Sequence, residues 1–511
     1  MKTSAMNPRL GALTALAAFS VFGLASGRPA AAQTQVVDSA AAINLSLTEA
    51  VRLAEQKSHE VVIARAGVMR ARGQELQISS QLLPQLLGSA GYTKTLRSQF
   101  SALASPDTTP ASTSPPGPCD QYLRGASATT AERIAGLEDA QRCALGANPF
   151  GDFGNLGFGA ENQYQLGLSL SQNIFTGGRI RSQLAAARAG RRAAEVTLAS
   201  QRARAALTVA QAYFDAALSA RLAGIAELSL AQSDALVSQV QLSRDVGRTS
   251  EFELLRARVA RDNQRPVIVQ RRSEREIALL RLRQLLDLPL DAPIALVTPV
   301  DDTAAVYAAI APIRIQAASD DLEFRAPVRA ARAGVDAGEA TLRAVRAQRL
   351  PTVSLTSNYG RVAFPTSGLP GNGDFRENWT VGLGAQVPLF TGGRQRGEEM
   401  AARASLDESR ARLEQTRDLA ALDARVQETA LAQARGAWEA SAGTAEQAER
   451  AYAIAKVRYL EGISTQLELD DSRLLFEQAQ VNRATAARNL QLAIVRVELL
   501  QDLPLPGTSI P

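Results

Sequence analysis

The sequence predicts a mainly α-helical fold with a small β-barrel contribution, in which long antiparallel helices form a helical barrel and four strands per chain span a membrane. Two observations lead to this prediction. First, residues 161–290 align without a gap with residues 376–505, at a constant offset of 215 positions, so one supersecondary unit is used twice. Second, in each copy a long proline-free run of helix-forming residues follows a shorter stretch in which apolar and polar residues alternate.

The duplication is visible in short motifs that recur in the same order. The pairs are Phe175-Thr176-Gly177-Gly178-Arg179 with Phe390-Thr391-Gly392-Gly393-Arg394, Gly247 with Gly462, Glu253-Leu254 with Glu468-Leu469, and Asp287-Leu288-Pro289-Leu290 with Asp502-Leu503-Pro504-Leu505. We therefore divide the chain into a first structural repeat (33–290), a linker (291–311), a second repeat (312–505) and a C-terminal tail (506–511).

Residues 1–32 have the pattern of a secretory signal peptide. Lys2 and Arg9 precede the apolar run Leu10–Leu24, and the small residues Ala30–Ala32 follow it. The sequence thus predicts an exported protein. No later segment reaches the roughly 18 uninterrupted apolar residues that a transmembrane helix needs.

Charge and residue types argue against several function classes. Of the 56 basic side chains, three lie in residues 1–32, which leaves 53 against 51 acidic ones, a balance that disfavours nucleic acid as a partner. The single histidine, His59, has no second histidine or cysteine nearby, so we expect a surface helix residue rather than a metal ligand. The sequence has no nucleophile elbow, metal cluster or phosphate-binding loop, and we expect neither an enzyme nor a bound cofactor.

Two long helices are predicted over Arg179–Arg244 and Arg394–Tyr459, where Ala, Leu, Arg, Gln and Glu dominate. At 1.5 Å per residue each would be roughly 100 Å long. A globular core cannot cover such a helix, so it must lie in a bundle or tube of equally long helices. Shorter helical segments supply the neighbours: Leu47–Leu82, Asp320–Leu350 and two return helices that end near residues 287 and 501. Two such half helices, stacked end to end, match one long helix.

Each long helix ends at a glycine turn that we call a tip, because glycine is favoured where a helix stops in the left-handed conformation. Ser250 and Thr465 each precede a glutamate by three positions, which predicts capping boxes that open the return helices. The two tips comprise Val246, Gly247, Arg248, Thr249 and Ser250, and Glu461, Gly462, Ile463, Ser464 and Thr465.

Four segments alternate apolar and polar residues and predict half-buried strands: Leu86–Tyr92, Tyr164–Leu170, Thr352–Tyr359 and Trp379–Val387. Each repeat therefore carries one hairpin. Four strands cannot close a barrel by themselves, and unpaired edges are not tolerated in lipid, so several chains must share one barrel. Aromatic residues near the predicted strand ends suit interfacial girdles or ordinary strand-end packing: Tyr92, Tyr164, Phe175, Tyr359, Trp379 and Phe390.

The two repeats differ by an insert at residues 97–160. Pro84 to Phe175 spans 91 positions, whereas Pro351 to Phe390 spans 39. The insert is rich in Ser, Thr, Pro and Gly, a loop composition, and we expect it on the extracellular side, where outer-membrane barrels carry their long loops. It holds both cysteines, Cys119 and Cys143. In an oxidising compartment we expect a disulfide, with two free thiols as the alternative.

In this order and spacing, these elements resemble the TolC family of bacterial outer-membrane efflux proteins. The resemblance covers nearly the whole mature chain and includes Leu45–Val51 at the start of the first helix, the Leu-Pro strand entries, the Phe-Thr-Gly-Gly-Arg turns and the glycine tips. It implies a homotrimer with a 12-stranded barrel in the outer membrane and a helical tunnel across the periplasm. It also implies a passive exit duct whose tips dock to a periplasmic adaptor fed by an inner-membrane transporter.

The resemblance also assigns roles at the tips. Glu468 and Asp471 would ring the narrow periplasmic mouth, and Glu253 and Tyr459 match positions whose contacts hold the mouth closed. In a trimer the two acidic positions give six carboxylates around one axis, a ring that attracts cations and whose crowding raises some pKa values. Acidic residues in a first helical turn also simply favour the helix dipole. Ser464 stands where a basic residue is common, which puts the family's means of closure in doubt here.

Three readings of the function compete. The first is a passive trimeric duct, for drug, metal or small-molecule efflux by a tripartite pump, or alternatively for type I protein secretion. The second is a non-channel trimeric coiled-coil surface protein, which the hairpin interruptions disfavour. The third is a secreted enzyme. Cargo, pump and adaptor are not encoded in the chain, nor is it evident whether the insert occludes the outer mouth.

Overall fold

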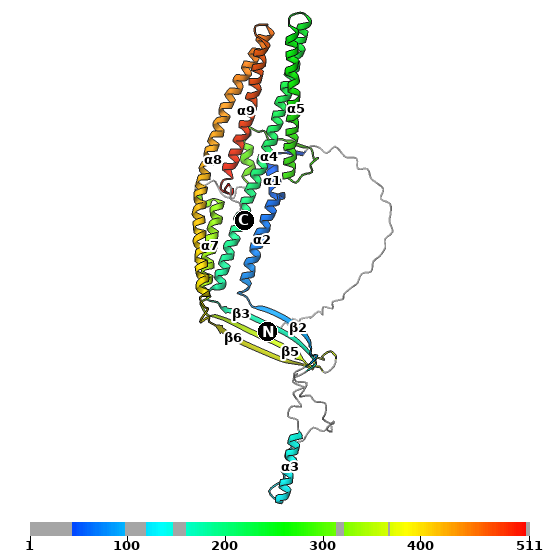
Figure 1. Cartoon of the computed structure of the whole chain (residues 1–511), viewed down its shortest axis with the longest axis vertical. Helices are drawn as coiled ribbons and strands as arrows, with labels where there is room; N and C mark the ends of the chain where they lie inside the picture. The colour runs from blue at the N-terminus through cyan, green and yellow to red at the C-terminus, as the bar shows by residue number, and fades with distance from the viewer. Residues whose placement is uncertain (1–42, 98–118, 147–159, 313–320, 366–367, 507–511) are drawn as a thin grey trace, which may run out of the picture.

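The computed structural model describes residues 43–97, 119–146, 160–312, 321–365 and 368–506, so the predicted signal peptide lies outside the described residues. Long helices rise from one end of a four-stranded sheet (Figure 1). In the part of the chain that the structure describes, no helix has both the length and the apolar character needed to cross a membrane. The helices are α1 (Leu47–Lys57), α2 (His59–Ser80), α3 (Thr130–Gly146), α4 (Arg179–Asp245), α5 (Glu251–Leu285), α6 (Thr303–Ile310), α7 (Ala326–Ala347), α8 (Arg394–Leu460) and α9 (Gln466–Glu498). The strands are β1 (Ile43–Leu45), β2 (Gln85–Lys94), β3 (Asn162–Phe175), β4 (Ile294–Leu296), β5 (Thr352–Ala363) and β6 (Phe375–Gln386).

The predicted long helices are confirmed as α4 and α8, each of 67 residues. Shorter helices flank different halves of each. Near the sheet, α2 contacts α4 through Glu75 and Arg188; near the tip, α5 contacts α4 through Arg272 and Glu227. Likewise α7 and α9 pack along successive parts of α8. The end-to-end stacking of half helices expected from their lengths is therefore present.

The four predicted strands are confirmed as one antiparallel sheet in the order β2-β3-β5-β6. Its register sorts the side chains onto two faces, because neighbouring strands place partners on the same side. Leu355 lies opposite Leu383, and Tyr359 lies opposite Trp379, on a predominantly apolar face. The residues that alternate with these along the strands, and so lie on the opposite face, are mostly Ser, Thr, Asn, Gln and Gly. This alternation suits a sheet with lipid on one side and water on the other. The strands of this single chain form an open sheet rather than a closed barrel.

The expected aromatic residues lie towards both ends of this sheet. Tyr92 and Tyr164 are paired in register, with ring centroids 4.8 Å apart. Phe175 ends β3 at the helical side of the sheet, and Phe390 lies just beyond β6, 91% exposed.

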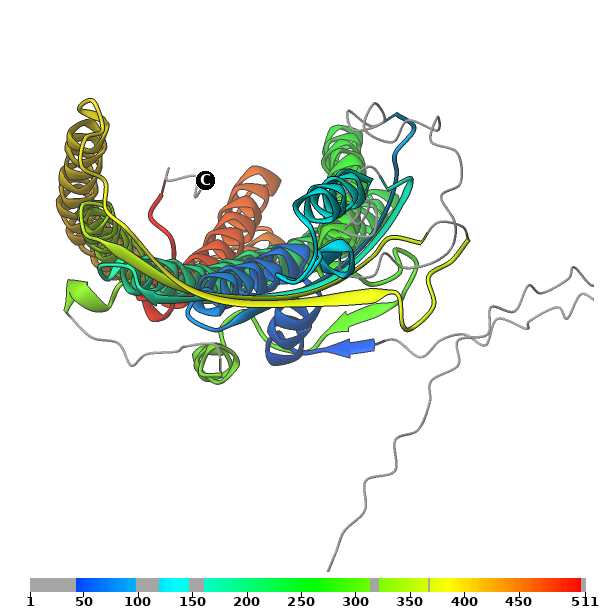
Figure 2. The same cartoon turned by 90° about the horizontal axis from the view of Figure 1, so that it is seen from below.

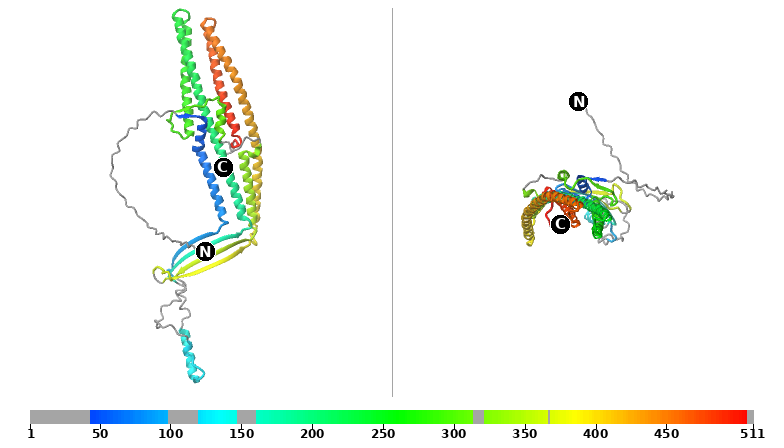
Figure 3. Two further views of the ribbon diagram at one scale, coloured as in Figure 1. Left: turned by 180° about the vertical axis from the view of Figure 1, so that it is seen from behind. Right: turned by 90° about the horizontal axis from the view of Figure 1, so that it is seen from above.

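Seen along the helices, the molecule is an arc (Figures 2 and 3). The small elements α1, α6, β1 and β4 lie on its convex side, and β1 pairs in parallel with β4. Tyr213 of α4 is fully buried beneath them; its hydroxyl donates to Leu45 O (3.0 Å) and accepts from Thr298 N (3.0 Å). The convex side is therefore the outer side of the wall at mid-height, where these elements form a second layer.

Three sequence expectations need correction. The helix predicted over Leu47–Leu82 breaks at Ser58, whose non-helical backbone (φ −56°, ψ 125°) lets α1 turn its apolar face onto α4 and α6. The helix predicted over Asp320–Leu350 begins only at Ala326, because Arg325 is extended and Pro327 opens the first turn. The insert, expected to be a loop, contains α3. The linker, for which no secondary structure was predicted, contains β4 and α6.

The predicted disulfide is present. It joins Cys119, in a short 3₁₀ turn, to Cys143 of α3 and closes this part of the insert on itself. The other parts of the insert, 98–118 and 147–159, lie outside the described residues.

Candidate functional site

Both tips have the same backbone structure, as the duplication requires. Gly247 and Gly462 have φ values of 77° and 73°, a left-handed conformation that glycine adopts without strain. The amide of Arg248 donates to Ser243 O (2.8 Å), and that of Ile463 donates to Arg458 O (2.9 Å). These bonds, together with those from the two glycine amides, are Schellman motifs, which satisfy the last carbonyls of α4 and α8.

The return helices begin with the expected caps. Ser250 Oγ accepts from Glu253 N (3.3 Å), and Thr465 Oγ1 accepts from Glu468 N (3.3 Å). Each bond satisfies one orphan amide at a helix start. The tips are thus rigid turns rather than loose loops, and each carries an exposed apolar side chain: Val246 is 64% exposed and Ile463 is 68% exposed.

Glu468 and Asp471 are both exposed on α9. They are three positions apart, so they lie on one face of α9. That face is about 140–160° around the helix from Arg473, a residue that contacts α4. The two carboxylates therefore project away from the α4–α5 hairpin. Whether they form a ring depends on the assembly, and that role stays a prediction.

Tyr459 and Glu253, predicted as gate contacts, come close together across the two hairpins. Tyr459 of α8 packs against a small core of Val237, Val240, Leu254 and Ala257, which belongs to α4 and α5. Burial raises the pKa of its phenol above the ordinary value, and the negative charges of Glu253 and Asp470 add to this rise. Within the described residues no hydrogen bond joins Tyr459 to Glu253, so their relation is packing and charge.

Gln466, the first residue of α9, makes a direct polar contact between the hairpins. It is 2% exposed. With the amide oriented to suit its partners, its nitrogen donates to Glu253 O (3.1 Å) and its oxygen accepts from Ala257 N (3.2 Å) on α5. A side chain of α9 is therefore hydrogen-bonded to the backbone of α5 one turn from the tip.

A second polar contact lies further from the tips, between α9 and α4. Arg473 is 6% exposed, and its guanidinium donates to Ser229 Oγ (2.6 Å). Ser229 in turn donates to Glu477 Oε2 (2.8 Å). Asp470 lies nearby, and burial raises the pKa of its carboxyl although Arg473 and Arg256 oppose the rise. We call Gln466, Tyr459, Asp470 and Arg473 the inter-hairpin contact.

Sequence reasoning found only part of this contact. It singled out Tyr459 and Glu253 but missed Gln466, Asp470 and Arg473. One signal was available for Asp470: its counterpart in the first repeat, 215 positions earlier, is Leu255, so an acid replaces an apolar residue. Nothing comparable marks Gln466, whose role depends on the placement of one hairpin against the other.

Comparison with known proteins identifies the family. A model of the outer membrane efflux protein family matches residues 139–287 and 318–500. The toluene efflux pump outer membrane protein TtgF of Pseudomonas putida is 28% identical over 259 residues, which are 50% of this chain and 51% of that protein. The chain thus matches about half the length of this relative. The solvent efflux pump outer membrane protein SrpC of Pseudomonas putida is 26% identical over 339 residues, 63% of this chain and 67% of SrpC.

A solved structure shows the same fold. The CmeC outer membrane channel of Campylobacter jejuni superimposes with a TM-score of 0.66 at 17% identity, over 91% of this chain and 87% of CmeC. The family match covers both repeats, and the fold is that of channel proteins rather than enzymes. The chain belongs to the outer membrane efflux protein family and resides in the outer membrane.

Proposed function

We propose that three copies of this chain form one exit duct through the outer membrane and the periplasm. The observation that carries the proposal is the open sheet: β2 and β6 are its edges, and one face is predominantly apolar. Unpaired backbone groups at these edges would each cost several kcal/mol in lipid, about 2–7 kcal/mol by transfer measurements. Three four-stranded sheets give twelve strands, which can close and remove every edge.

The lumen of this duct is the concave side of the arc. The convex side carries the second layer of small elements, so it faces away from the axis (Figure 2). The domain division made from the sequence fits this arrangement, with one hairpin of strands and one hairpin of helices per repeat. In the duct, both helical hairpins point their tips towards the inner membrane.

The tips are the proposed docking surface for a periplasmic adaptor, which in turn receives cargo from an inner-membrane transporter. Their turns are rigid, and their exposed side chains include apolar Val246 and Ile463 and charged Arg248 and Glu461. An apolar centre with a polar rim is typical of protein interfaces. The names of the relatives, outer membrane components of efflux pumps, support such an assembly.

Glu468 and Asp471 form the proposed constriction at the periplasmic mouth, and the inter-hairpin contact holds that mouth closed. Opening separates the α8–α9 hairpin from the α4–α5 hairpin, so it breaks the bonds of Gln466 and Arg473. This offers a means of closure that does not need a basic residue at Ser464.

Small organic molecules are the proposed cargo, because the relatives TtgF and SrpC are named for toluene and solvent efflux. Drug and metal efflux belong to the same tripartite class. Type I protein secretion is the alternative. The duct has no substrate pocket of its own in this proposal, and selection among cargoes falls to the transporter.

Ion conductance in planar bilayers tests the proposal. Purified protein should form cation-selective channels, and Glu468→Ala/Asp471→Ala should reduce that selectivity. Glu439→Ala/Glu449→Ala is the matched control, since it removes two exposed carboxylates of α8 away from the tips. Unaltered selectivity in the first variant would leave the duct intact and reduce the two residues to helix caps. The duct itself would be contradicted if neither the well-folded wild type nor the Gln466→Ala variant, in which the mouth is loosened, conducts ions.

A further inference from the structure

Arginines recur at seven-residue intervals along α8, at Arg396, Arg403, Arg410 and Arg417. On α4, three of the four corresponding positions of the first repeat hold arginine (Arg181, Arg188 and Arg202), and the position that matches Arg410 holds Glu195. Residues seven apart lie on nearly the same side of a helix. The arginine stripe is therefore a feature of the repeated unit and occurs twice.

Two members of this stripe contact elements on the convex, outer side of the wall. Its members farthest from the sheet reach elements of the outer layer: Arg417 pairs with Glu323 of the 3₁₀ turn Leu322–Phe324 (2.7 Å), and Arg202 pairs with Glu55 of α1 (3.4 Å). Because residues at seven-residue spacing lie on nearly the same side of a helix, we expect the remaining members to lie on this side as well.

Positive charge is in large excess where the helices meet the sheet. The four helical segments there, 70–82, 179–194, 338–350 and 394–403, contain thirteen arginines and four glutamates. Just beyond these segments, Glu195 and Asp336 pair with Arg191 and Arg192, which still leaves a clear excess of arginine. We call the thirteen arginines the arginine belt. Because the four segments lie side by side next to the sheet, the charge is concentrated at one level of the molecule (Figure 1).

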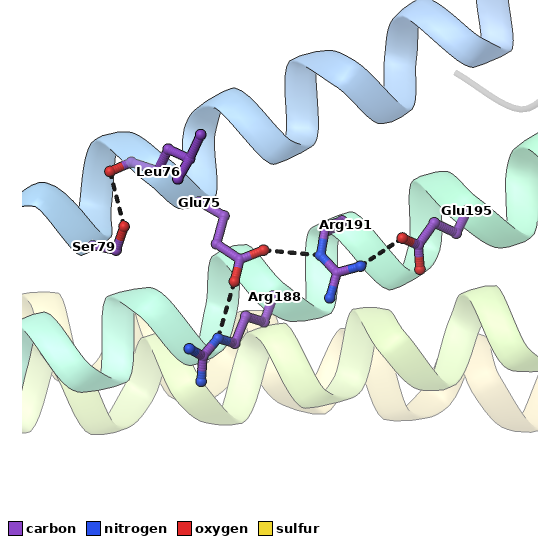
Figure 4. Close-up of polar contacts among 6 residues, drawn as sticks. All are labelled: Glu75, Leu76, Ser79, Arg188, Arg191 and Glu195. Atoms are coloured by element: carbon purple, nitrogen blue, oxygen red, sulfur yellow. Dashed lines mark hydrogen bonds and ion pairs between the residues drawn. The ribbon is translucent and has the colours of Figure 1, made fainter.

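Two of the four glutamates are already shared among several arginines. Glu75 of α2 accepts from Arg188 (3.1 Å) and Arg191 (2.8 Å) of α4 (Figure 4). The hydrogen bond from Arg188 contributes most to lowering the pKa of its carboxyl.

In the second repeat, Glu399 of α8 pairs with three arginines, Arg346 (3.1 Å) and Arg349 (2.6 Å) of α7 and Arg403 (3.4 Å) of α8. The bond from Arg346 contributes most to lowering its pKa. Both glutamates therefore remain ionised through a wide pH range, yet each neutralises only one of its partners.

The belt leaves guanidinium groups open to a further anion. Arg181 and Arg396, equivalent in the two repeats, form no ion pair with the residues that the structure describes. Arg396 lines a pocket of about 470 Å³ together with Arg349, Glu399, Met400 and Arg403. Three guanidinium groups around one carboxylate give this pocket a net positive charge. A methionine in its wall adds an apolar contact.

The pocket lies beside the end of the membrane-facing sheet. Arg349 is two residues before Pro351, where the chain enters β5. Leu389 and Phe390, which follow β6, are 93% and 91% exposed, and Arg396 comes only six residues after Phe390. Apolar side chains that suit acyl chains thus give way, within a few residues, to arginines that suit phosphate groups.

We propose that the arginine belt binds the phosphate groups of anionic phospholipids in the periplasmic leaflet of the outer membrane, with the pocket of Arg349, Arg396 and Arg403 as one defined site per protomer. Guanidinium groups bind phosphate oxygens through paired hydrogen bonds, and basic pockets at a membrane surface hold lipid headgroups. The inference depends on the placement of the sheet in the membrane. It does not depend on cargo, adaptor or pump.

Native mass spectrometry of the purified full-length protein, titrated with phosphatidylglycerol or phosphatidylcholine, tests this site. The wild type should retain phosphatidylglycerol in preference to phosphatidylcholine. Each arginine near an anionic lipid surface contributes about 1 kcal/mol, which is about fivefold in affinity, so Arg349→Gln/Arg396→Gln/Arg403→Gln should lose on the order of 100-fold for one bound lipid per protomer. The matched control, Arg412→Gln/Arg425→Gln/Arg450→Gln, removes three exposed arginines of α8 that pair only with glutamates of their own helix, and should retain the preference.

The single variant Arg396→Gln should fold normally, because this arginine has no ion pair to lose among the described residues. We expect it to lose about fivefold in affinity for phosphatidylglycerol. Equal retention of the two lipids by wild type would overturn the proposal, as would equal losses in the pocket and control variants. Displacement of phosphatidylglycerol by millimolar inorganic phosphate alone would also overturn it, since the site would then recognise free phosphate rather than lipid.

Discussion

Gln466→Ala should shift the duct towards its open state. Gln466 is buried and makes two hydrogen bonds across the hairpins, to Glu253 O and Ala257 N of α5. A net hydrogen bond contributes about 1 kcal/mol, so the upper bound is about 2 kcal/mol per protomer. Glu253 O and Ala257 N are also four residues apart in α5 and keep each other as helical partners, which reduces the loss. We expect a change of about 1–2 kcal/mol, or about 5- to 30-fold in the open-to-closed ratio for each protomer.

Single-channel recording measures this ratio directly as open time. Gln478→Ala is the control, because Gln478 lies on the same helix but is exposed and bonds only to Asn482 of α9. The account predicts a large rise in open time for Gln466→Ala and little change for Gln478→Ala. Equal behaviour of the two variants would refute the view that Gln466 holds the mouth closed.

Three further predictions concern charge, pH and the insert. Asp423→Ala should destabilise the protein by about 3–5 kcal/mol, seen as a lower unfolding midpoint, because it leaves a buried guanidinium without its carboxylate. The side chain of Arg325 is 1% exposed, and its other hydrogen bond to the described residues is to Ala420 O. Arg325→Met/Asp423→Leu should lose less stability, and the reverse order would count against this explanation. Burial raises the pKa of Asp470 in the packed hairpins, so packing is favoured at low pH and this contribution is lost as pH rises through the raised pKa. Open time should therefore increase from acidic pH towards neutrality, and this pH dependence should be weaker in Asp470→Asn. An unchanged pH profile in that variant would show that Asp470 does not cause the pH dependence. Cys119→Ser/Cys143→Ser should leave conductance unchanged but increase cleavage of the insert by external protease on intact cells; protection equal to wild type would show that the disulfide does not hold this segment.

The regular parts of the fold were predictable because short-range rules determine them. Glycine at positions 247 and 462 with a serine or threonine three residues later predicts a tip, and alternation over Thr352–Tyr359 predicts a strand. Because the unit occurs twice in the sequence, each of these features is predicted independently in both copies. Both long helices, all four strands of the main sheet and both tips followed from these rules.

Long-range contacts determine the parts that were missed. Ser58 breaks a helix-forming segment because α1 gains burial against α4 and α6, which sequence spacing does not show. The strand Ile294–Leu296 is only three residues long and is stabilised by pairing with Ile43–Leu45, about 250 positions earlier. Gln466 looked like an ordinary first-turn residue, and only the packing of two hairpins gives it partners.

The copy number of the complex tests the central claim most directly. The four-stranded sheet of one chain has two free edges, and the account closes them by combining three chains into one twelve-stranded barrel. Native mass spectrometry of the detergent-solubilised, conducting protein should give a mass of three chains. A conducting monomer or dimer would contradict the account, because its sheet could not reach twelve strands.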